Sequence, residues 1–126
     1  MIGLSKEQIL LLHNMIYERY GGDVGVLNEG MLDSTLQTPF QTFGGEELIL
    51  DTKDKIVHLT FGLIKNHAFR DGNKRIGALV LLMLLDLNGY HVKTTNSEFV
   101  DIVMGIAASE KDEEDLLNWV EDHLSR

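Results

Sequence analysis

Residues 76–85 read IGALVLLMLL, and this uncharged run decides the fold class. The apolar stretch spans twelve residues up to Leu87, whereas a helix that crosses a bilayer needs about 20. A helix that is apolar on every side belongs in a protein core. The run therefore predicts a central helix, buried on all sides, that begins near Asn73 and ends at Asn88-Gly89, a favourable left-handed helix end.

Helical signals continue outward from this run in both directions. Asp51 or Thr52 can cap a helix that extends to about Asn66, and its apolar side chains form one face. Two pairs with capping-box spacing open further helices, namely Ser5 with Gln8 and Thr95 with Glu98. The helices expected besides these two lie between Ser5 and Gly21, ahead of Pro39, after Thr95, and around Leu116 to Leu124.

The segment TPFQTFGGEELIL, residues 38–50, is the exception to this helical pattern. It contains two phenylalanines, two threonines and a Gly-Gly pair, which favour an extended flap or a small hairpin. The predicted fold class is all-α, a compact bundle of about six helices with that small flap. One proline and no low-complexity stretch in 126 residues indicate a single domain, residues 1–126.

The charge balance limits the classes of partner. The chain has 20 acidic and 11 basic side chains and a formal net charge of −9, which disfavours direct binding to nucleic acid. It contains no cysteine, so it can form neither a disulfide nor a thiolate metal site. No signal-like segment opens the chain, and we expect a cytoplasmic protein without a membrane partner.

The residues directly before the apolar run, 67–75, read HAFRDGNKR. A glycine at the start of a helix lets an anion approach the first backbone N–H groups, which lack partners within the helix. Arg75 offers a planar fork for phosphate oxygens and Lys74 a mobile charge, and Asn73 can cap the helix or donate to an oxygen. Residues Gly72 to Arg75 therefore predict a phosphate site at a helix N-terminus.

Two side chains of this segment can supply chemistry. His67 can take a proton from an attacking hydroxyl near neutral pH, and Asp71 can share a magnesium ion with substrate phosphates. Taken alone, a histidine at a helix end or an Asp-Gly-Asn turn is usually structural. A purely structural turn would, however, avoid cations at the start of a helix, where the dipole is unfavourable to them.

HAFRDGNKR resembles the signature of the Fic/Doc (Fido) superfamily, H-P-F-x-D/E-G-N-G/K-R. It is most similar to the death-on-curing (Doc) branch, because Lys74 stands where AMP-transferring Fic proteins have glycine. TFGGEEL and GNKRIGALVLL are similar too, so the resemblance covers nearly the whole chain. Ala68 replaces the usual proline, which reduces loop rigidity and removes no functional group.

The resemblance implies a six-helix fold whose motif loop binds ATP with Mg²⁺. It implies that His67 is the general base and Asp71 the magnesium ligand, and that Gly72, Asn73, Lys74 and Arg75 bind the phosphates. It also implies that the flap aligns a target segment by strand addition. The flap residues concerned are Thr38, Phe40, Thr42, Phe43 and Gly44.

The activity implied by the Doc branch is that of a toxin kinase. Such an enzyme transfers the γ-phosphate of ATP to a threonine or serine hydroxyl of a translation factor like elongation factor Tu, and translation stops. Two alternatives stay open: a Fic-type transfer of AMP to a protein hydroxyl, and a catalytically silent helical binding module.

The resemblance also implies a Phd-like antitoxin, whose C-terminal helix folds into a groove of the toxin. Many Fic proteins carry an inhibitory S/T-x-x-x-E-G/N helix of their own. The single Glu-Gly here is Glu29-Gly30, and Gly25 stands where that motif requires serine or threonine. We therefore expect restraint by a separate protein.

Seven acidic residues and one lysine lie between Glu110 and Asp122. They form either a solvated helix face or a docking surface for a basic partner helix. The other four histidines show no metal-ligand spacing and receive no role; they are His13, His58, His91 and His123. Three aromatic residues are expected in the core or at its rim, namely Tyr17, Tyr20 and Trp119.

Overall fold

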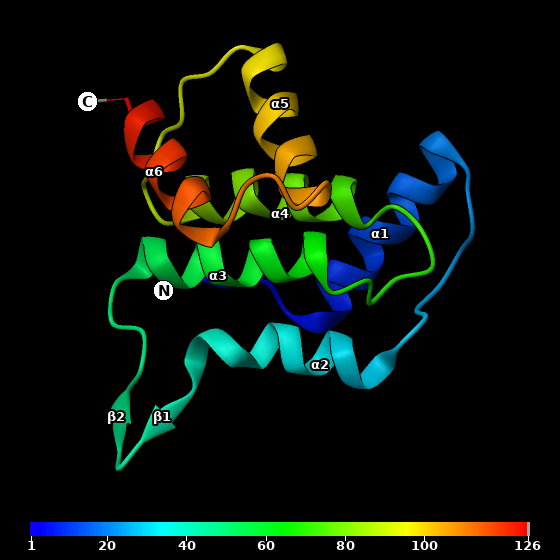
Figure 1. The fold of residues 1–126 in the computed structure, drawn as a ribbon. Helices are drawn as coiled ribbons and strands as arrows, with labels where there is room; N and C mark the ends of the chain where they lie inside the picture. Colours follow the sequence, from blue (N-terminus) through cyan, green and yellow to red (C-terminus); the bar gives the residue numbers. More distant parts are fainter. Residues whose placement is uncertain (126) are drawn as a thin grey trace.

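The computed structural model describes residues 1–125, and an antiparallel pair of helices lies at its centre, α3 (Thr52–Lys65) and α4 (Asn73–Leu87). The other elements are α1 (Lys6–Tyr20), α2 (Glu29–Gln37), the 3-10 helix η1 (Thr38–Phe40), β1 (Thr42–Phe43), β2 (Glu46–Glu47), α5 (Asn96–Ala107) and α6 (Glu113–His123). α2 lies along one side of α3, α5 and α6 cover the other side, and α1 packs against α4 (Figure 1). The predicted all-α fold with a small hairpin is confirmed.

The core is built mainly from α3 and α4. Ile56, Leu63, Ile76 and Leu81 have at most 1% of their surface exposed. The expectation that α4 is buried on all sides was wrong in part, since Leu82 is 36% exposed. Its neighbours α1, α3 and α5 leave one flank of α4 uncovered, because a small bundle has too few helices to surround one of them.

A glycine allows the two central helices to approach closely. A Cβ atom built on Gly77 would overlap the side chain of Ile64 and lie 3.3 Å from the backbone nitrogen of Ile64. The absence of a side chain at Gly77 thus sets the distance between α3 and α4. Because the motif loop connects these helices, the same contact sets the distance that the loop spans between the end of α3 and the start of α4.

The helix starts follow the predicted caps, with one difference. Ser5 forms the expected capping box with Gln8, and the Asp51 side chain accepts a hydrogen bond from the N–H of Lys53 at 2.8 Å. Thr95 accepts from the N–H of Glu98, which is half of the expected box. The other half is absent, because the Glu98 carboxylate binds the Thr95 hydroxyl and His123 instead of a backbone N–H.

The predicted flap is shorter than expected. Gly44 and Gly45 have φ of 61° and 84°, which is the backbone of a tight hairpin turn between β1 and β2. Thr38 and Phe40 lie in η1 and not in an extended strand. The reason is Pro39, which stands in the first turn of η1, where its restricted φ favours helical geometry.

The length and composition of a helix decide whether it can cross a membrane. Across residues 1–125, none of the helices combines the length and the apolar character that a membrane crossing requires.

Candidate active site

The motif loop, residues 66–72, connects α3 to α4 at the end of the bundle opposite the hairpin (Figure 1). A segment after α1 holds this loop by backbone pairing. The N–H groups of Leu27 and Asn28 donate to the Ala68 carbonyl at 2.8 and 3.0 Å, and Phe69 forms a bridge with Val26. Ala68 and Phe69 are each 1% exposed, so both point into the core as the sequence predicted.

Asn73 closes the loop on itself. Its amide nitrogen donates to the Phe69 carbonyl at 3.1 Å, and the N–H of Phe69 donates to the amide oxygen at 3.1 Å. The side chain therefore neither caps α4 nor points to a phosphate, the two roles considered from the sequence. Its side-chain amide holds the loop, and only its backbone N–H is available to bind an anion.

His13, in the middle of α1, packs against the motif loop and forms a hydrogen bond with it. The His13 side chain is buried, and its ring stacks on Phe69 with centroids 3.9 Å apart and planes 12° apart. Its Nε2 atom lies 2.7 Å from the carbonyl oxygen of Asp71. Because a carbonyl oxygen only accepts, Nε2 carries a proton and donates it to this bond.

Two backbone N–H groups orient the carboxylate of Asp71. Oδ1 accepts from Gly72 at 2.8 Å, and Oδ2 accepts from Asp23 at 3.3 Å. These bonds, that of Gly72 foremost, lower the pKa of Asp71 below its usual 3.8, and the charge of Arg75 contributes. Asp71 is therefore ionised at neutral pH. Gly22 is required nearby, because a Cβ there would overlap the carboxylate.

The N-terminus of α4 is open to an anion. Its N-cap, Gly72, has φ of 75° and no side chain, whereas a side chain caps each of the other five α-helices within residues 1–125. The N–H groups of Asn73, Lys74 and Arg75 have no acceptor within the helix. The first turn contains no acidic residue, so it combines two cations with three free N–H groups.

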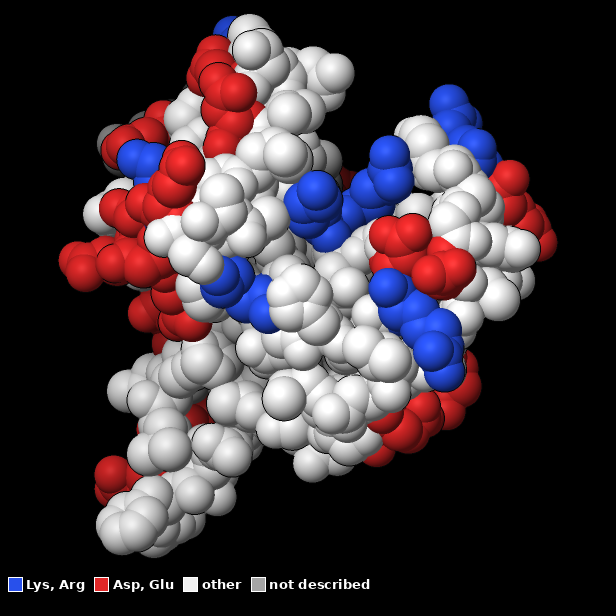
Figure 2. All heavy atoms as spheres, turned by 45° about the vertical axis from the view of Figure 1, so that its right-hand side comes forward, with Lys and Arg blue, Asp and Glu red and all other residues white. Residues whose placement is uncertain are grey.

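Basic side chains gather on the face around this helix end, with an acidic group between them (Figure 2). Arg70, Lys74 and Arg75 are all exposed. The guanidinium of Arg75 lies 4.3 Å from the centre of the Tyr20 ring, a cation–π contact that fixes its direction. The molecule thus presents positive charge here despite its acidic composition.

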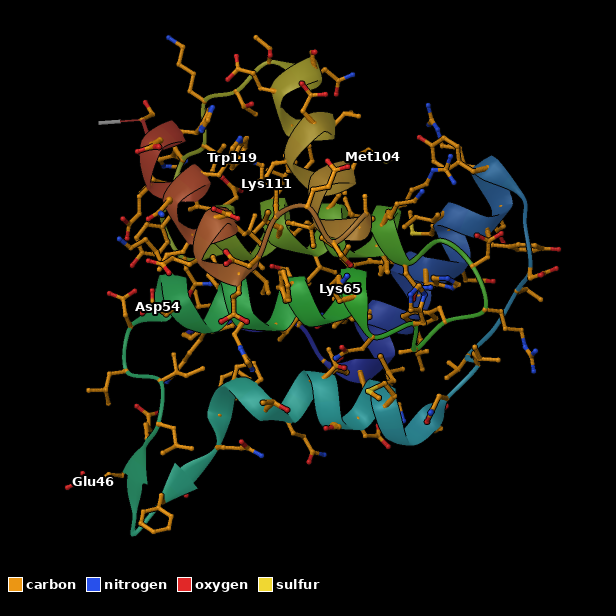
Figure 3. All side chains as sticks on the ribbon, in the orientation of Figure 1. Glu46, Asp54, Lys65, Met104, Lys111 and Trp119 are labelled. Atoms are coloured by element: carbon orange, nitrogen blue, oxygen red, sulfur yellow. The ribbon has the colours of Figure 1, made fainter. Side chains whose placement is uncertain are left out.

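A pocket of about 390 Å³ joins this helix end to α5. Asp71, Lys74 and Arg75 line its polar side. Phe99 and Met104 line its apolar side, and Figure 3 labels Met104 on α5. One charged side and one apolar side suit a ligand with phosphates and a planar base.

His67 is exposed and has φ of 50°, one of two positive φ values outside glycine in residues 1–125. This left-handed conformation costs about 1–2 kcal/mol for a residue with a side chain. A residue with a side chain in this strained conformation marks a candidate functional position, which here would be that of the imidazole. His67 lines a second opening, of about 280 Å³, together with Arg70 and Lys74.

The structure brings the motif residues together and leaves the flap apart. His67 and Asp71 lie in the loop that ends at the start of α4, whereas the hairpin precedes the opposite end of α3 (Figure 1). α3 has 14 residues, so it separates the two by about 20 Å. A target segment that touches both Phe43, which is 79% exposed, and His67 must extend along the whole helix.

Sequence reasoning missed several residues of this site. It gave His13 no role and placed Tyr20 at the core or its rim, and it assigned nothing to Asp23 or to the apolar wall of α5. The contact of His13 with Asp71 joins residues 58 positions apart. No periodicity or spacing could indicate it, because the contact exists only once α1 is packed beneath the loop.

Comparison with known proteins agrees with this geometry. The model of the Fic/DOC family matches residues 3–85, more than half of the chain. Over 86 residues the chain is 31% identical to the protein named Toxin Doc of Mycolicibacterium smegmatis, covering 68% of this chain and 64% of that one. Over 107 residues it is 28% identical to the protein named Protein kinase doc of Escherichia phage P1, covering 85% and 83%. The chain belongs to the Fic/DOC family.

Proposed function

We propose that this protein is a Doc-type toxin that acts as a cytoplasmic protein kinase. It would transfer the γ-phosphate of ATP to a threonine or serine hydroxyl of a translation factor similar to elongation factor Tu. One observation carries the proposal: an exposed His67, held in a left-handed backbone, lies in the loop that leads directly into three free N–H groups and two cations at the start of α4. The names of the two relatives, a toxin and a protein kinase, support it.

ATP would lie in the pocket between the loop and α5. Its phosphates would bind the N–H groups at the start of α4 and the side chains of Lys74 and Arg75. Its base would contact Phe99 and Met104 on the apolar side. The volume, about 390 Å³, lies within the range of pockets that hold small ligands.

Asp71 suits a shared magnesium ion. Each of its oxygens accepts one N–H and has a lone pair left, and its lowered pKa keeps the group ionised. No cluster of three or more acidic or histidine side chains within residues 1–125 is arranged to hold a metal ion alone. A single carboxylate with substrate phosphates is a common way to bind Mg²⁺, which when bound offsets phosphate charge.

His67 would act as the general base. The hydroxyl of the target would give its proton to the imidazole while its oxygen forms a bond to the γ-phosphorus. The bond between that phosphorus and the β–γ bridging oxygen breaks, and ADP leaves. The imidazolium then returns its proton to water. In the alternative reaction the same oxygen attacks the α-phosphorus, and pyrophosphate leaves.

The side chain of Lys74 favours the kinase reaction over AMP transfer. Lys74 lines both openings beside the loop, so its chain and charge occupy space that a glycine would leave for the trailing phosphates. The nucleotide should therefore bind with its γ-phosphate, and not its α-phosphate, next to His67.

The decisive test uses purified protein, Mg²⁺, a bacterial translation extract, and ATP labelled at the α- or the γ-phosphorus. We expect label on a protein from γ-labelled ATP alone, and a loss of about 10²-fold or more in His67→Ala. Label from α-labelled ATP alone would instead establish AMP transfer. Lys74→Gly is the matched variant, since it keeps the base and alters the phosphate site.

A silent binding module is the remaining alternative, and growth tests it. Expression of the wild type should arrest growth, and His67→Ala should relieve the arrest. We also propose that a Phd-like antitoxin restrains the toxin by inserting a C-terminal helix into a groove of this protein. Co-expression of the neighbouring reading frame should restore growth, and harmless expression of the wild type without that frame would contradict the toxin proposal.

A further inference from the structure

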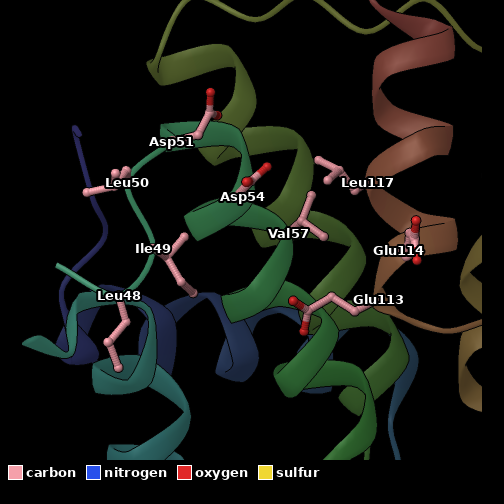
Figure 4. Close-up of a pocket in the computed structure, with 9 residues that line it drawn as sticks. All are labelled: Leu48, Ile49, Leu50, Asp51, Asp54, Val57, Glu113, Glu114 and Leu117. Atoms are coloured by element: carbon pink, nitrogen blue, oxygen red, sulfur yellow. The ribbon is translucent and has the colours of Figure 1, made fainter. Parts of the chain in front are cut away.

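A groove of about 580 Å³ lies far from the motif loop, and the proposed phosphotransfer reaction does not use it. It is formed by the connector after β2, residues 48–51, by the start of α3 and by the start of α6 (Figure 4). The motif loop follows the opposite end of α3. We call this the α3–α6 groove.

Apolar side chains form part of its wall. Val57 is almost fully buried at its base, with Leu117 of α6 beside it. On the connector, Leu48 and Leu50 are 62% and 76% exposed although both are large and apolar. Contact with a partner would remove these leucines from water, which is favourable.

Carboxylates form the rest of the wall, and no cation lines the groove. Asp51, Asp54, Glu113 and Glu114 lie around it, all four at the N-cap or in the first turn of α3 or α6. The nearby lysines bind elsewhere: Lys53 lies 3.7 Å from Glu121 and Lys55 lies 2.8 Å from Glu47. Within the described residues the lining of the groove is therefore negative, although Glu113 bonds to His58 and the charge of Lys53 partly lowers the pKa of Asp54.

The pKa of Asp54 reflects the excess of negative charge in the groove. Burial raises the pKa of its carboxyl above 3.8, and the negative charges of Asp51 and Glu121 raise it further. The ionised form of Asp54 is thus disfavoured in the free protein. A cation supplied by a partner would favour that form.

We propose that the α3–α6 groove docks a segment of a partner protein that presents lysine or arginine beside apolar side chains. The leucines of the connector and the carboxylates match the two kinds of side chain. Nucleic acid does not fit, because its phosphates would meet four carboxylates. A second copy of this chain fits poorly, because each copy has a net charge of −9.

Binding of a labelled peptide tests this without ATP and in the His67→Ala protein, so failure of the kinase proposal would leave it standing. The probe is a short helical peptide with leucine and lysine on one face, measured by fluorescence anisotropy at about 0.15 M salt. Asp54→Lys with Glu114→Lys changes the groove and spares Asp51, which caps α3, and Glu113, which binds His58.

The matched control, Asp101→Lys with Asp122→Lys, makes the same change in net charge on exposed acidic residues outside the groove. We expect the groove variant to bind at least about tenfold more weakly than wild type, and the control within about threefold. Leu50→Asp should also weaken binding, and so should replacement of the peptide leucines by serine. Thermal unfolding checks that each variant is folded.

Three results would overturn the proposal. Equal losses in the groove and control variants would mean that only net charge attracts the peptide. Undiminished binding by Leu50→Asp and by the serine peptide would show that apolar side chains do not contribute to recognition. A wild type that sediments as a dimer, and becomes a monomer in Asp54→Lys with Glu114→Lys, would assign the groove to a second copy.

Discussion

At the residue scale, the site depends on a histidine that takes no part in the proposed proton transfer. His13 donates to the Asp71 carbonyl at 2.7 Å and stacks on Phe69. It therefore holds both ends of the loop turn that positions the Asp71 carboxylate and the start of α4. We infer that His13 is a positioning residue, since its ring is buried and bonds to the backbone of the loop.

Two substitutions separate positioning from stability. His13→Leu removes the donor, and we expect phosphotransfer to fall by about 10–10²-fold, because displaced catalytic groups lose rate steeply. His13→Gln keeps a donor and should recover part of the rate and of the Mg²⁺ dependence. Initial rates over a range of Mg²⁺ concentration, with unfolding temperatures, provide the measurement. Equal rates for both variants at equal stability would contradict the positioning role.

At the element scale, the loop inherits its geometry from the contact between α3 and α4. Gly77 faces Ile64 with no room for a Cβ atom, one turn beyond the anion site at the start of α4. Any added volume at this point must push α4 away from α3. The free N–H groups at the start of α4 would then move relative to His67.

Gly77→Ala therefore has a predicted sign opposite to that of helix propensity. Alanine normally stabilises a helix interior by about 1 kcal/mol over glycine, but overpacking here should lower the free energy of unfolding by about 1–3 kcal/mol. The control is Gly30→Ala in α2, where a Cβ would make only an ordinary contact at 3.7 Å and should stabilise. Urea unfolding of both variants measures this, and a stabilised Gly77→Ala would show that the helix contact is looser.

At the scale of the whole molecule, charge is divided between two regions. Cations gather around the motif loop, and carboxylates surround the α3–α6 groove and the surface of α6 (Figure 2). The negative total therefore does not describe the site that would meet ATP. A nucleotide and a basic partner segment would be attracted to different ends of α3.

The contact between α5 and α6 should make stability depend on pH. The ring of His123 stacks on Trp119, and its nitrogens lie 2.7 Å from the Trp119 carbonyl and 2.7 Å from a Glu98 oxygen. Both nitrogens can donate only in the imidazolium. The pKa of His123 is raised above 6.5, chiefly by the Trp119 carbonyl, and that of Glu98 is lowered below 4.5, chiefly by His123.

The sign follows from these directions. The contribution of His123 is complete below pH 6.5 and is lost as pH rises through its folded-state pKa, and that of Glu98 is complete above pH 4.5 and is lost on acidification. Wild type should therefore exceed Glu98→Gln in unfolding temperature most between these values, with the difference shrinking towards pH 9. Asp101→Asn on the same helix is the control, and a difference independent of pH would contradict the ion pair.

Much of the fold could be predicted because its signals are local. The caps at Ser5 and Asp51 act over four residues or fewer and the apolar run of α4 is one continuous stretch, so the chain shows them directly. The flap was predicted less well, since Pro39 turns Thr38 and Phe40 into η1. The exposed flank of α4 escaped prediction, because hydrophobicity does not say how many neighbours a helix has.

The sequence by itself determined the all-α class and the position of the motif loop, because these follow from neighbouring residues. Only the tertiary structure decided that His13 supports Asp71, that Tyr20 orients Arg75, and that Asn73 is used for the loop. It also separated the hairpin from the motif loop by the length of α3 (Figure 1). The physical reason is that these contacts and distances arise from the packing of helices far apart in the chain, which no local pattern encodes.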